Sequence, residues 1–236
     1  MLSLRQGLGL DTMDAVSDSS WQPSNESCLE AWFKKDTGLT LVDSGGTDYV
    51  SNWADSSSNS NDMAQTTASK RPSYSGSPNN ELVFPTVSSG DWLTSSSNIL
   101  LAGEFTLVFK IHPSFPSGTS SSSGYIISDN QSLTRTTIDI GTENEIIWRF
   151  AFQPAGFSTI TLDAGRTFGD DYLVLTRDGS DTITLWHNGV SQADTNSAAG
   201  TYAVHFESIS NSIIKMFAGT IEEIQAYSCS NATLTS

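Results

Sequence analysis

Apolar residues recur at every second position in many short segments of this chain. No stretch of eleven or more residues keeps the spacing of an amphipathic helix, in which apolar residues fall at i, i+3, i+4 and i+7. The clearest alternation lies in segment 105–111, where one face carries only apolar side chains, those of Phe105, Leu107, Phe109 and Ile111. This pattern is typical of a half-buried strand, and we expect it to be central. The chain as a whole is predicted to be all-β.

Two turn sequences predict a meander of three strands. Segments 172–177 and 182–187 flank the turn 178–181 (DGSD), whose glycine can adopt the positive φ of a tight hairpin. A second turn, Asn188-Gly189, follows at once and leads into segment 190–193. The side chains expected to face the interior of the fold are Phe105, Leu107, Phe109, Leu173, Leu175, Ile183 and Leu185.

Other segments bring the predicted total to about thirteen or fourteen short strands, enough for two packed sheets. They are 29–33, 49–53, 81–84, 92–94, 125–128, 136–140, 146–152, 158–162, 202–206 and 213–227. The serine-rich stretches 55–62 and 117–124 are too polar to bury and are predicted to be surface loops. We expect one domain at 27–236, preceded by an N-terminal arm at 1–26.

Composition and charge exclude several kinds of partner. Of the 236 residues, 37% are hydrophobic and 16% are charged, and 26 acidic against 11 basic residues give a formal net charge of −15. Nucleic acid and anionic membranes are repelled by such a charge at long range, so we expect no nucleic-acid partner. No apolar run approaches the roughly 18 residues that span a bilayer, and we expect neither membrane insertion nor a cleavable signal peptide.

Seven segments fit one family pattern in order and spacing. They are 29–33 (LEAWF), 50–62 (VSNWADSSSNSND), 71–74 (RPSY), 105–109 (FTLVF), 175–179 (LTRDG), 185–189 (LWHNG) and 217–224 (FAGTIEEI). Together they resemble the laminin-G-like, concanavalin A-like jelly-roll family of lectins and glucanases, over roughly residues 28–230. The resemblance implies a two-sheet antiparallel jelly-roll sandwich. Modules of this kind are carried by phage-type structural proteins, and the arm lies outside the family pattern.

Catalytic constellations are missing from the sequence. A glycosidase needs two carboxylates flanking the scissile bond, but segment 137–142 (TIDIGT) has only the central aspartate of the pattern Glu-x-Asp-x-x-Glu that laminarinase-like relatives carry. Glu143 and Glu145 lie in a turn-like GTENE sequence that is typical of solvated carboxylates. The three histidines have no nucleophile elbow nearby, and no Cys or His pair has zinc-ligand spacing. We therefore predict that the protein is not an enzyme.

Tryptophans near loops are the candidate ligand-binding residues. Sugar sites on jelly rolls use exposed aromatic rings as stacking platforms, and Trp53, Trp92 and Trp148 lie near loops. The alternative for each of them is that the ring fills the core, since a sandwich of this size buries several large aromatic side chains.

Calcium is the one metal that the loop chemistry suits. Asp55, Asn59, Asn61 and Asp62 supply hard oxygen ligands within eight residues of a surface loop. Relatives of the resembled fold bind calcium at loop rims. Asn, Ser and Asp are also ordinary turn formers, so a loop without metal is the alternative.

The resemblance also implies a place for the two cysteines. In that fold the first and last strands pair antiparallel, which brings Cys28, just before segment 29–33, to the same end as Cys229. We expect the two residues to be close. Either a disulfide joins them or both remain free thiols, as in a reducing cytosol.

Three function classes remain open. The first is a non-catalytic virion structural protein, a capsid decoration or a tail or fibre component, bound to other virion subunits through the arm and contacting cell-surface glycans. The second is a secreted or cell-surface carbohydrate-binding module, with an extracellular location in place of the virion. The third is a glycoside hydrolase, which ranks last because the sequence shows no catalytic carboxylate pair. In the first two cases we expect a homo-oligomer or membership of a larger assembly.

Overall fold

Strands make up nearly all the regular structure of the computed structural model. It describes residues 22–85, 90–114, 124–128, 138–140, 150–152, 156–158, 171–196, 203–210 and 217–230. Within these ranges the helical elements are two short 3-10 turns, η2 (Pro23–Asn25) and η3 (Ala68–Lys70). None of the described helices is long and apolar enough to cross a membrane. The prediction of an all-β chain is confirmed.

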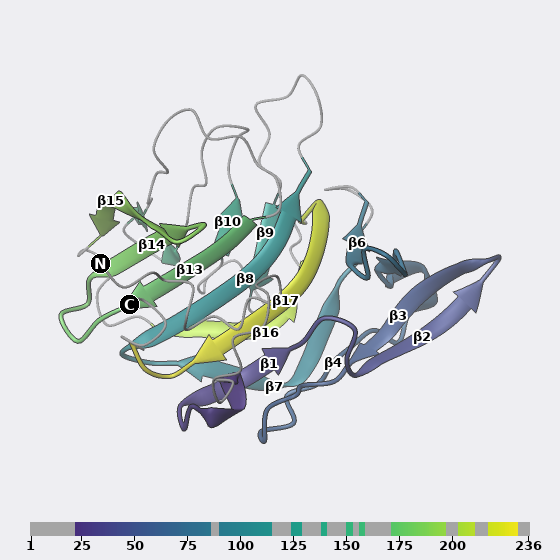
Figure 1. Ribbon diagram of the computed structural model, residues 1–236, viewed down its shortest axis with the longest axis horizontal. Helices are drawn as coiled ribbons and strands as arrows, with labels where there is room; N and C mark the ends of the chain where they lie inside the picture. Colours follow the sequence, from purple (N-terminus) through teal and green to yellow (C-terminus); the bar gives the residue numbers. More distant parts are fainter. Residues whose placement is uncertain are drawn as a thin grey trace, which may run out of the picture.

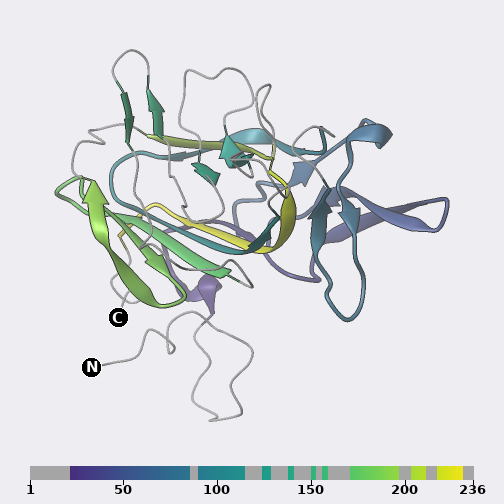
Figure 2. The same cartoon turned by 90° about the horizontal axis from the view of Figure 1, so that it is seen from above.

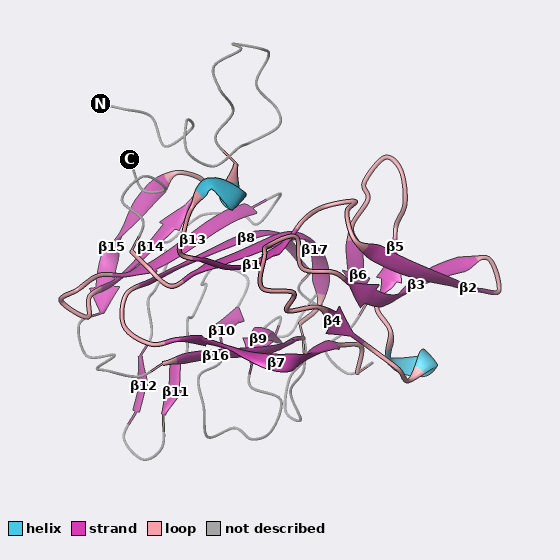
Figure 3. Ribbon diagram, turned by 90° about the horizontal axis from the view of Figure 1, so that it is seen from below, coloured by secondary structure: helices cyan, strands magenta, loops and turns pink. Residues whose placement is uncertain are grey.

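The strands form two layers of antiparallel sheet, as Figures 1 and 3 show. The first layer contains, in order, β1 (Leu29–Phe33), β17 (Gly219–Tyr227), β8 (Phe105–Pro113), β13 (Asp171–Arg177), β14 (Ile183–His187) and β15 (Val190–Asn196). The second contains β10 (Ile138–Ile140), β9 (Gly124–Ser128), β16 (Val204–Ile209), β7 (Leu93–Leu101) and β4 (Met63–Ala64). This arrangement confirms the predicted two-sheet sandwich.

Short strands at one side connect the two layers. Hydrogen bonding runs without a break from β4 through β3 (Thr47–Trp53), β5 (Ser73–Tyr74) and β6 (Leu82–Phe84) to β17. β2 (Leu39–Ser44) pairs with β3 alone, and the resulting hairpin projects beyond the sandwich (Figure 2). β11 (Phe150–Phe152) and β12 (Gly156–Ser158) form a separate two-stranded ribbon.

The core lies between the layers, and β8 is central as predicted, since it pairs with β17 on one side and β13 on the other. All seven side chains expected in the interior are at most 1% exposed. A second, smaller apolar cluster covers the opposite face of the first layer and includes Trp32, Val108 and Val174. Strand β8 is therefore buried on both faces, which its alternation alone had not indicated.

The meander β13–β14–β15 is confirmed, with one correction to its first turn. At 178–181 the residue with positive φ is Asp181, at 59°, rather than Gly179. A Cβ atom on Gly179 would lie 2.5 Å from Glu104 Oε1, so close approach is what this glycine permits. Asn188 and Gly189, at φ 48° and 78°, form the second turn as expected.

The first and last strands pair antiparallel, with Leu29 opposite Tyr227. A disulfide joins Cys28 to Cys229, whose Cα atoms are 6.0 Å apart. The bond closes a loop with a sequence separation of 201 residues. It lies beside the outer apolar cluster and joins the first strand to the last at one end of their antiparallel pair.

Candidate functional site

A groove of about 630 Å³ lies between the β2–β3 hairpin and the loop that carries η3. This volume lies in the range of small-molecule sites, about 300–1,000 Å³. The hairpin contributes one wall, and the segments around η3, β5 and the start of β7 contribute the other. The lining residues are Val42, Asp43, Ser44, Thr47, Tyr49, Ala68, Ser69, Arg71, Ser73, Pro85 and Asp91.

Backbone pairing fixes the floor of the groove. Tyr49 on β3 lies opposite Ser73 on β5, and the N–H of Val50 donates to the carbonyl of Pro72 at 2.8 Å. Because side chains alternate along a strand, Val50 is fully buried while Tyr49 remains partly exposed and lines the groove. The aromatic ring therefore sits on a paired strand rather than on a loose loop.

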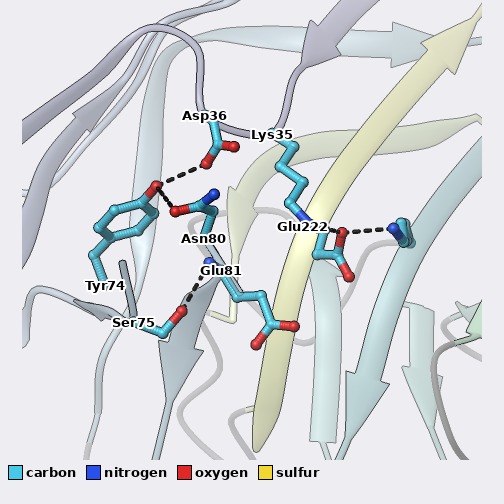
Figure 4. Close-up of polar contacts among 8 residues, drawn as sticks. Lys35, Asp36, Tyr74, Ser75, Asn80, Glu81 and Glu222 are labelled. Carbon is cyan, nitrogen blue, oxygen red and sulfur yellow. Dashed lines mark hydrogen bonds and ion pairs between the residues drawn. The ribbon is translucent and has the colours of Figure 1, made fainter. Parts of the chain in front are cut away.

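Polar contacts at the root of the hairpin hold it against the sandwich (Figure 4). Lys35 and Lys110 each place Nζ 2.6 Å from Glu222 Oε2. The Tyr74 hydroxyl donates to Asp36 Oδ1 at 2.7 Å. Burial and the neighbouring Asp36 carboxylate raise the pKa of Tyr74 to about 12. The segment between β1 and β2 is thus tied to β17 and to β5.

The opposite wall is organised around Arg71. Its guanidinium donates from Nε to the Gln65 carbonyl at 2.9 Å and from Nη2 to the Thr66 carbonyl at 3.2 Å. The buried Gln65 side chain in turn donates to the carbonyl of Trp92 at 3.2 Å and accepts from the N–H of Thr67. These bonds fix the guanidinium at the groove and leave its Nη1 group without a partner among the described residues.

The lining offers donors and acceptors to a ligand. Within the described part of the chain, the side-chain oxygens of Tyr49, Ser69, Ser73 and Asp91 make no hydrogen bonds. Burial raises the pKa of Asp91, and the positive charge of Lys70 partly offsets this shift. An aromatic ring beside unpaired hydroxyl, carboxylate and guanidinium groups suits a ligand that has both apolar C–H faces and many hydroxyls.

The predicted tryptophans occupy three different situations. Trp53 is fully buried, its ring packs 5.5 Å from that of Phe33, and its Nε1 donates to the Lys34 carbonyl. The prediction that Trp53 binds a ligand is therefore corrected, because its inward position on β3 places the ring in the core. Trp92 is half-buried next to the groove, with Lys70 Nζ 5.4 Å from its ring centre. Trp148 lies outside the described residues, as do Glu143 and Glu145.

Loop 55–62 gathers the four predicted calcium ligands at the free edge of β1. The Asp55 carboxylate accepts from the N–H groups of Trp32 (2.8 Å), Ser57 (2.8 Å) and Asn61 (2.9 Å) and from the Ser57 hydroxyl (2.7 Å). The N–H of Asp55 donates to Asp62 Oδ1 at 2.9 Å. The carboxylate of Asp55 is thus surrounded by donors, which a bound cation would have to displace.

The asparagines of the same loop form hydrogen bonds with the same edge of β1. Asn59 Nδ2 donates to the carbonyls of Leu29 and Glu30, both at 3.0 Å, and Asn61 Nδ2 donates to that of Glu30 at 2.9 Å. The loop therefore satisfies backbone groups of β1 that would otherwise need a neighbouring strand. Across the described residues, no three His, Cys, Asp or Glu side chains gather as a metal site would require. Calcium binding stays a prediction.

The groove residues were not predicted as a site from the sequence. The sequence indicates only a strand for Tyr49, and only a segment of the family pattern for Arg71 and Ser73. Their common signal was weak: an aromatic residue, an arginine and hydroxyl residues flanking serine-rich loops. Only the fold brings residues 42–49 of the hairpin against residues 68–73 and Asp91.

No protein-family model matches this sequence, and no curated protein does. Solved structures match the fold. The chain is similar to a Trypanosoma rangeli sialidase in complex with 2,3-difluoro-KDN (TM-score 0.52, 14% identity, 89% of this chain and 32% of that one). It is also similar to the binding domain of botulinum neurotoxin DC, solved with SialylT (TM-score 0.54, 11% identity, 85% and 50%) and with rat synaptotagmin II (0.57, 10%, 88% and 50%).

These matches concern the fold. This chain spans about a third of the length of the sialidase and half of that of the toxin binding domains. At such low identities no residue of those proteins is carried over to the groove. The matched structures are β-rich, in agreement with the all-β sandwich described above.

Proposed function

We propose that this chain is a non-catalytic carbohydrate-binding β domain and that a glycan binds in the groove beneath the β2–β3 hairpin. The observation that carries the proposal is the lining, in which Tyr49 lies with unpaired polar groups of Arg71 and Asp91 in a cavity of about 630 Å³. Sugar hydroxyls both donate and accept hydrogen bonds, so they match a lining of mixed donors and acceptors.

The fold comparisons support a carbohydrate-binding role. One matched toxin domain was solved with SialylT and the matched sialidase with a difluoro-KDN compound. The same toxin domain was also solved with rat synaptotagmin II, so a domain of this fold also accommodates a protein. For this chain we take a glycan as the ligand because most lining residues carry a hydroxyl or a charge, while the lining also offers apolar surface to the C–H faces of a sugar.

The biological setting that we propose is a virion, with an extracellular carbohydrate-binding module as the alternative. The support is the resemblance to modules of phage-type structural proteins and the apolar arm at residues 1–26, most of which lies outside the described residues. In this setting the arm attaches the domain to other virion subunits and the groove faces cell-surface glycans. Deleting residues 1–20 should then release a folded domain from the particle. Full occupancy of the truncated protein would contradict the role of the arm.

The test of glycan binding is a screen on a glycan array followed by calorimetry with matched variants. Tyr49→Phe and Tyr74→Phe each remove one phenolic hydroxyl, but only that of Tyr49 lines the groove. We expect Tyr49→Phe and Asp91→Asn to weaken binding several-fold, and Tyr49→Ala about tenfold or more, as for a residue at the centre of an interface. Tyr74→Phe removes a contact at the root of the hairpin but no lining group, so it should weaken binding less than Tyr49→Phe. Equal affinities for all variants would place the ligand elsewhere.

The same experiment tests the glycoside hydrolase alternative. Asp43 and Asp91 both line the groove, and burial raises the pKa of Asp91, the direction that a general acid requires. In our proposal both carboxylates only accept hydrogen bonds from the ligand. The glycans should therefore be recovered intact after prolonged incubation. Cleavage that is lost in Asp91→Asn would establish an enzyme instead.

A further inference from the structure

Strand β2 exposes a backbone edge that nothing in the described structure covers. It pairs with β3 alone, and every residue from Thr40 to Ser44 is exposed. Leu41 and Val42, at 38% and 39% exposure, are two of the four large hydrophobic side chains exposed in the described residues. An uncovered edge with apolar side chains is a template for pairing with another strand.

The contrast with β1 shows that this chain protects edges elsewhere. At the free edge of β1, the Asp55 carboxylate accepts from the N–H of Trp32, and the Trp32 carbonyl accepts from the N–H of Ser56 at 2.7 Å. Side chains of Asn59 and Asn61 complete that cover. β2 has no such loop, and neither lysine nor proline occurs in its sequence LTLVDS.

The direction of the free backbone groups follows from the turn. Gly45 and Gly46, at φ 68° and 84°, form a two-residue hairpin turn, which closes on a hydrogen-bonded pair, here Ser44 and Thr47. Hydrogen-bonded and non-bonded positions alternate along a strand. The N–H and C=O groups of Leu41 and Asp43 therefore point away from β3. The one register shift of the hairpin leaves Ser51 of β3 without an opposite residue on β2, although the Ser51 hydroxyl donates to the Thr40 carbonyl at 3.0 Å. Strand β2 itself runs regularly.

We propose that the β2 edge pairs antiparallel with β2 of a second copy of this chain, around a two-fold axis at Leu41. This interface shares strand β2 with the proposed glycan site, because Val42, Asp43 and Ser44 line the groove, but Leu41 does not line it. In an antiparallel ladder, residues whose backbone groups point outward must face one another. Leu41 then lies opposite Leu41 of the second copy, and Leu39 lies opposite Asp43.

The positions of the two Asp43 carboxylates favour this register, while the net charges of the two copies repel each other. The two Asp43 carboxylates lie four residues apart along the ladder, roughly 14 Å, which exceeds the Debye length of about 8 Å at physiological ionic strength. Centring the pair one residue further, on Val42, would bring them to roughly 7 Å. Because the hairpin projects from the sandwich (Figures 1 and 2), the two bodies, each of net charge −15, stay apart in the pair.

The association is expected to be weak and to tighten with salt. A pair of six-residue strands forms an interface below the size of stable dimers, so we expect a dissociation constant on the order of micromolar to millimolar. Salt screens the repulsion between the two acidic bodies. Sedimentation equilibrium of the full chain should show monomer and dimer, with the dimer fraction rising with protein and salt concentration. A single monomeric species at about 1 mM would overturn the proposal.

A charge pair at position 41 tests the two-fold axis itself. Leu41→Lys and Leu41→Asp each place like charges opposite one another, and each should weaken self-association about tenfold. Leu41→Lys should weaken self-association even though it lowers the net negative charge of each copy. Mixing the two variants places opposite charges on the axis and should restore the dimer as a heterodimer. Leu100→Lys, at a leucine 48% exposed on β7, is the matched control and should leave the dimer unchanged.

The variants also distinguish the β2 edge from the remaining surface of the molecule. A dimer that survives both Leu41 variants uses another surface, such as the arm, and contradicts the proposal. Failure of the mixture to associate would contradict the two-fold register. Leu41 does not line the groove, so all variants should keep the glycan affinity of the wild type. Loss of the dimer and loss of glycan binding are therefore distinguishable outcomes.

Discussion

Replacing Asp55 by asparagine tests whether loop 55–62 stabilises the fold by covering the edge of β1. The substitution keeps the size of the side chain and the acceptor Oδ1, which receives the N–H groups of Trp32 and Ser57. It replaces Oδ2 by an NH₂ group, which then faces the N–H of Asn61. The N–H of Asn61 and the hydroxyl of Ser57 therefore both lose this acceptor, and the remaining bonds lose the charge of the carboxylate.

The magnitude follows from these contacts. Hydrogen bonds to charged groups contribute about 1.5–3 kcal/mol each, against about 1 kcal/mol for neutral ones, and an unsatisfied donor costs about 1–3 kcal/mol. Because the loop is partly exposed, water offsets part of this loss. We expect Asp55→Asn to lower the free energy of unfolding by about 2–4 kcal/mol. Asp62→Asn, which alters a single acceptor on an exposed residue, should cost less than about 1 kcal/mol.

Urea unfolding of the two variants, with calcium and with a chelator, is the assay. If the loop stabilises the fold by covering the edge of β1, Asp55→Asn should lower the free energy of unfolding by the same amount with calcium and with a chelator. If the loop binds calcium, the wild type gains stability when calcium is added and Asp55→Asn does not. Equal stabilities of Asp55→Asn and Asp62→Asn would refute the reasoning from the hydrogen bonds.

Three further predictions concern other parts of the molecule. Replacing Cys28 and Cys229 by serine should lower the free energy of unfolding by up to about 5 kcal/mol, since their bond closes a loop of about 200 residues; a non-reduced digest without a linked peptide would contradict the bond. Tyr74 should ionise near pH 12, which a pH titration monitored by tyrosine absorbance measures. Asp36→Asn should lower the pKa of Tyr74. Because the folded pKa exceeds the unfolded value of about 10, the contribution of Tyr74 to stability is lost as pH rises from 10 to 12. Glycan affinity should fall on acidification at a higher pH than for an exposed aspartate, because the pKa of Asp91 is raised and its protonation removes an acceptor.

The sandwich could be predicted from the sequence because its strands place apolar side chains at every second position, even in β8, whose other face is also buried. Segment 105–111 and the meander 172–193 show this, and each turn has residues suited to its geometry. Strand β2 was missed for the same physical reason. Its residues are exposed on both faces, so LTLVDS carries no alternation to detect. The two-residue strands β4 and β5 are too short for any period.

The candidate site was harder to predict because it is made of residues distant in sequence. Tyr49 and Trp53 lie on the same strand, yet Trp53 points into the core while Tyr49 reaches the groove. The register shift at Ser51 reverses the alternation between them, so that Val50 and Trp53 are both buried while Tyr49 is not. Loop 55–62 was correctly assigned to the surface. The hydrogen bonds of Asp55 and Asn59 to β1 depend on β1 being an edge strand, which local sequence does not reveal.

Chemical-shift mapping by NMR during titration with a glycan from the array tests the central claim most directly. We predict that the perturbed amides cluster on the β2–β3 hairpin around Tyr49, on residues 68–73 and at Asp91, with contacts from the sugar protons to the Tyr49 ring. Perturbations centred on loop 55–62, on the outer face of β8 and β13, or on no described segment would contradict a glycan site in this groove.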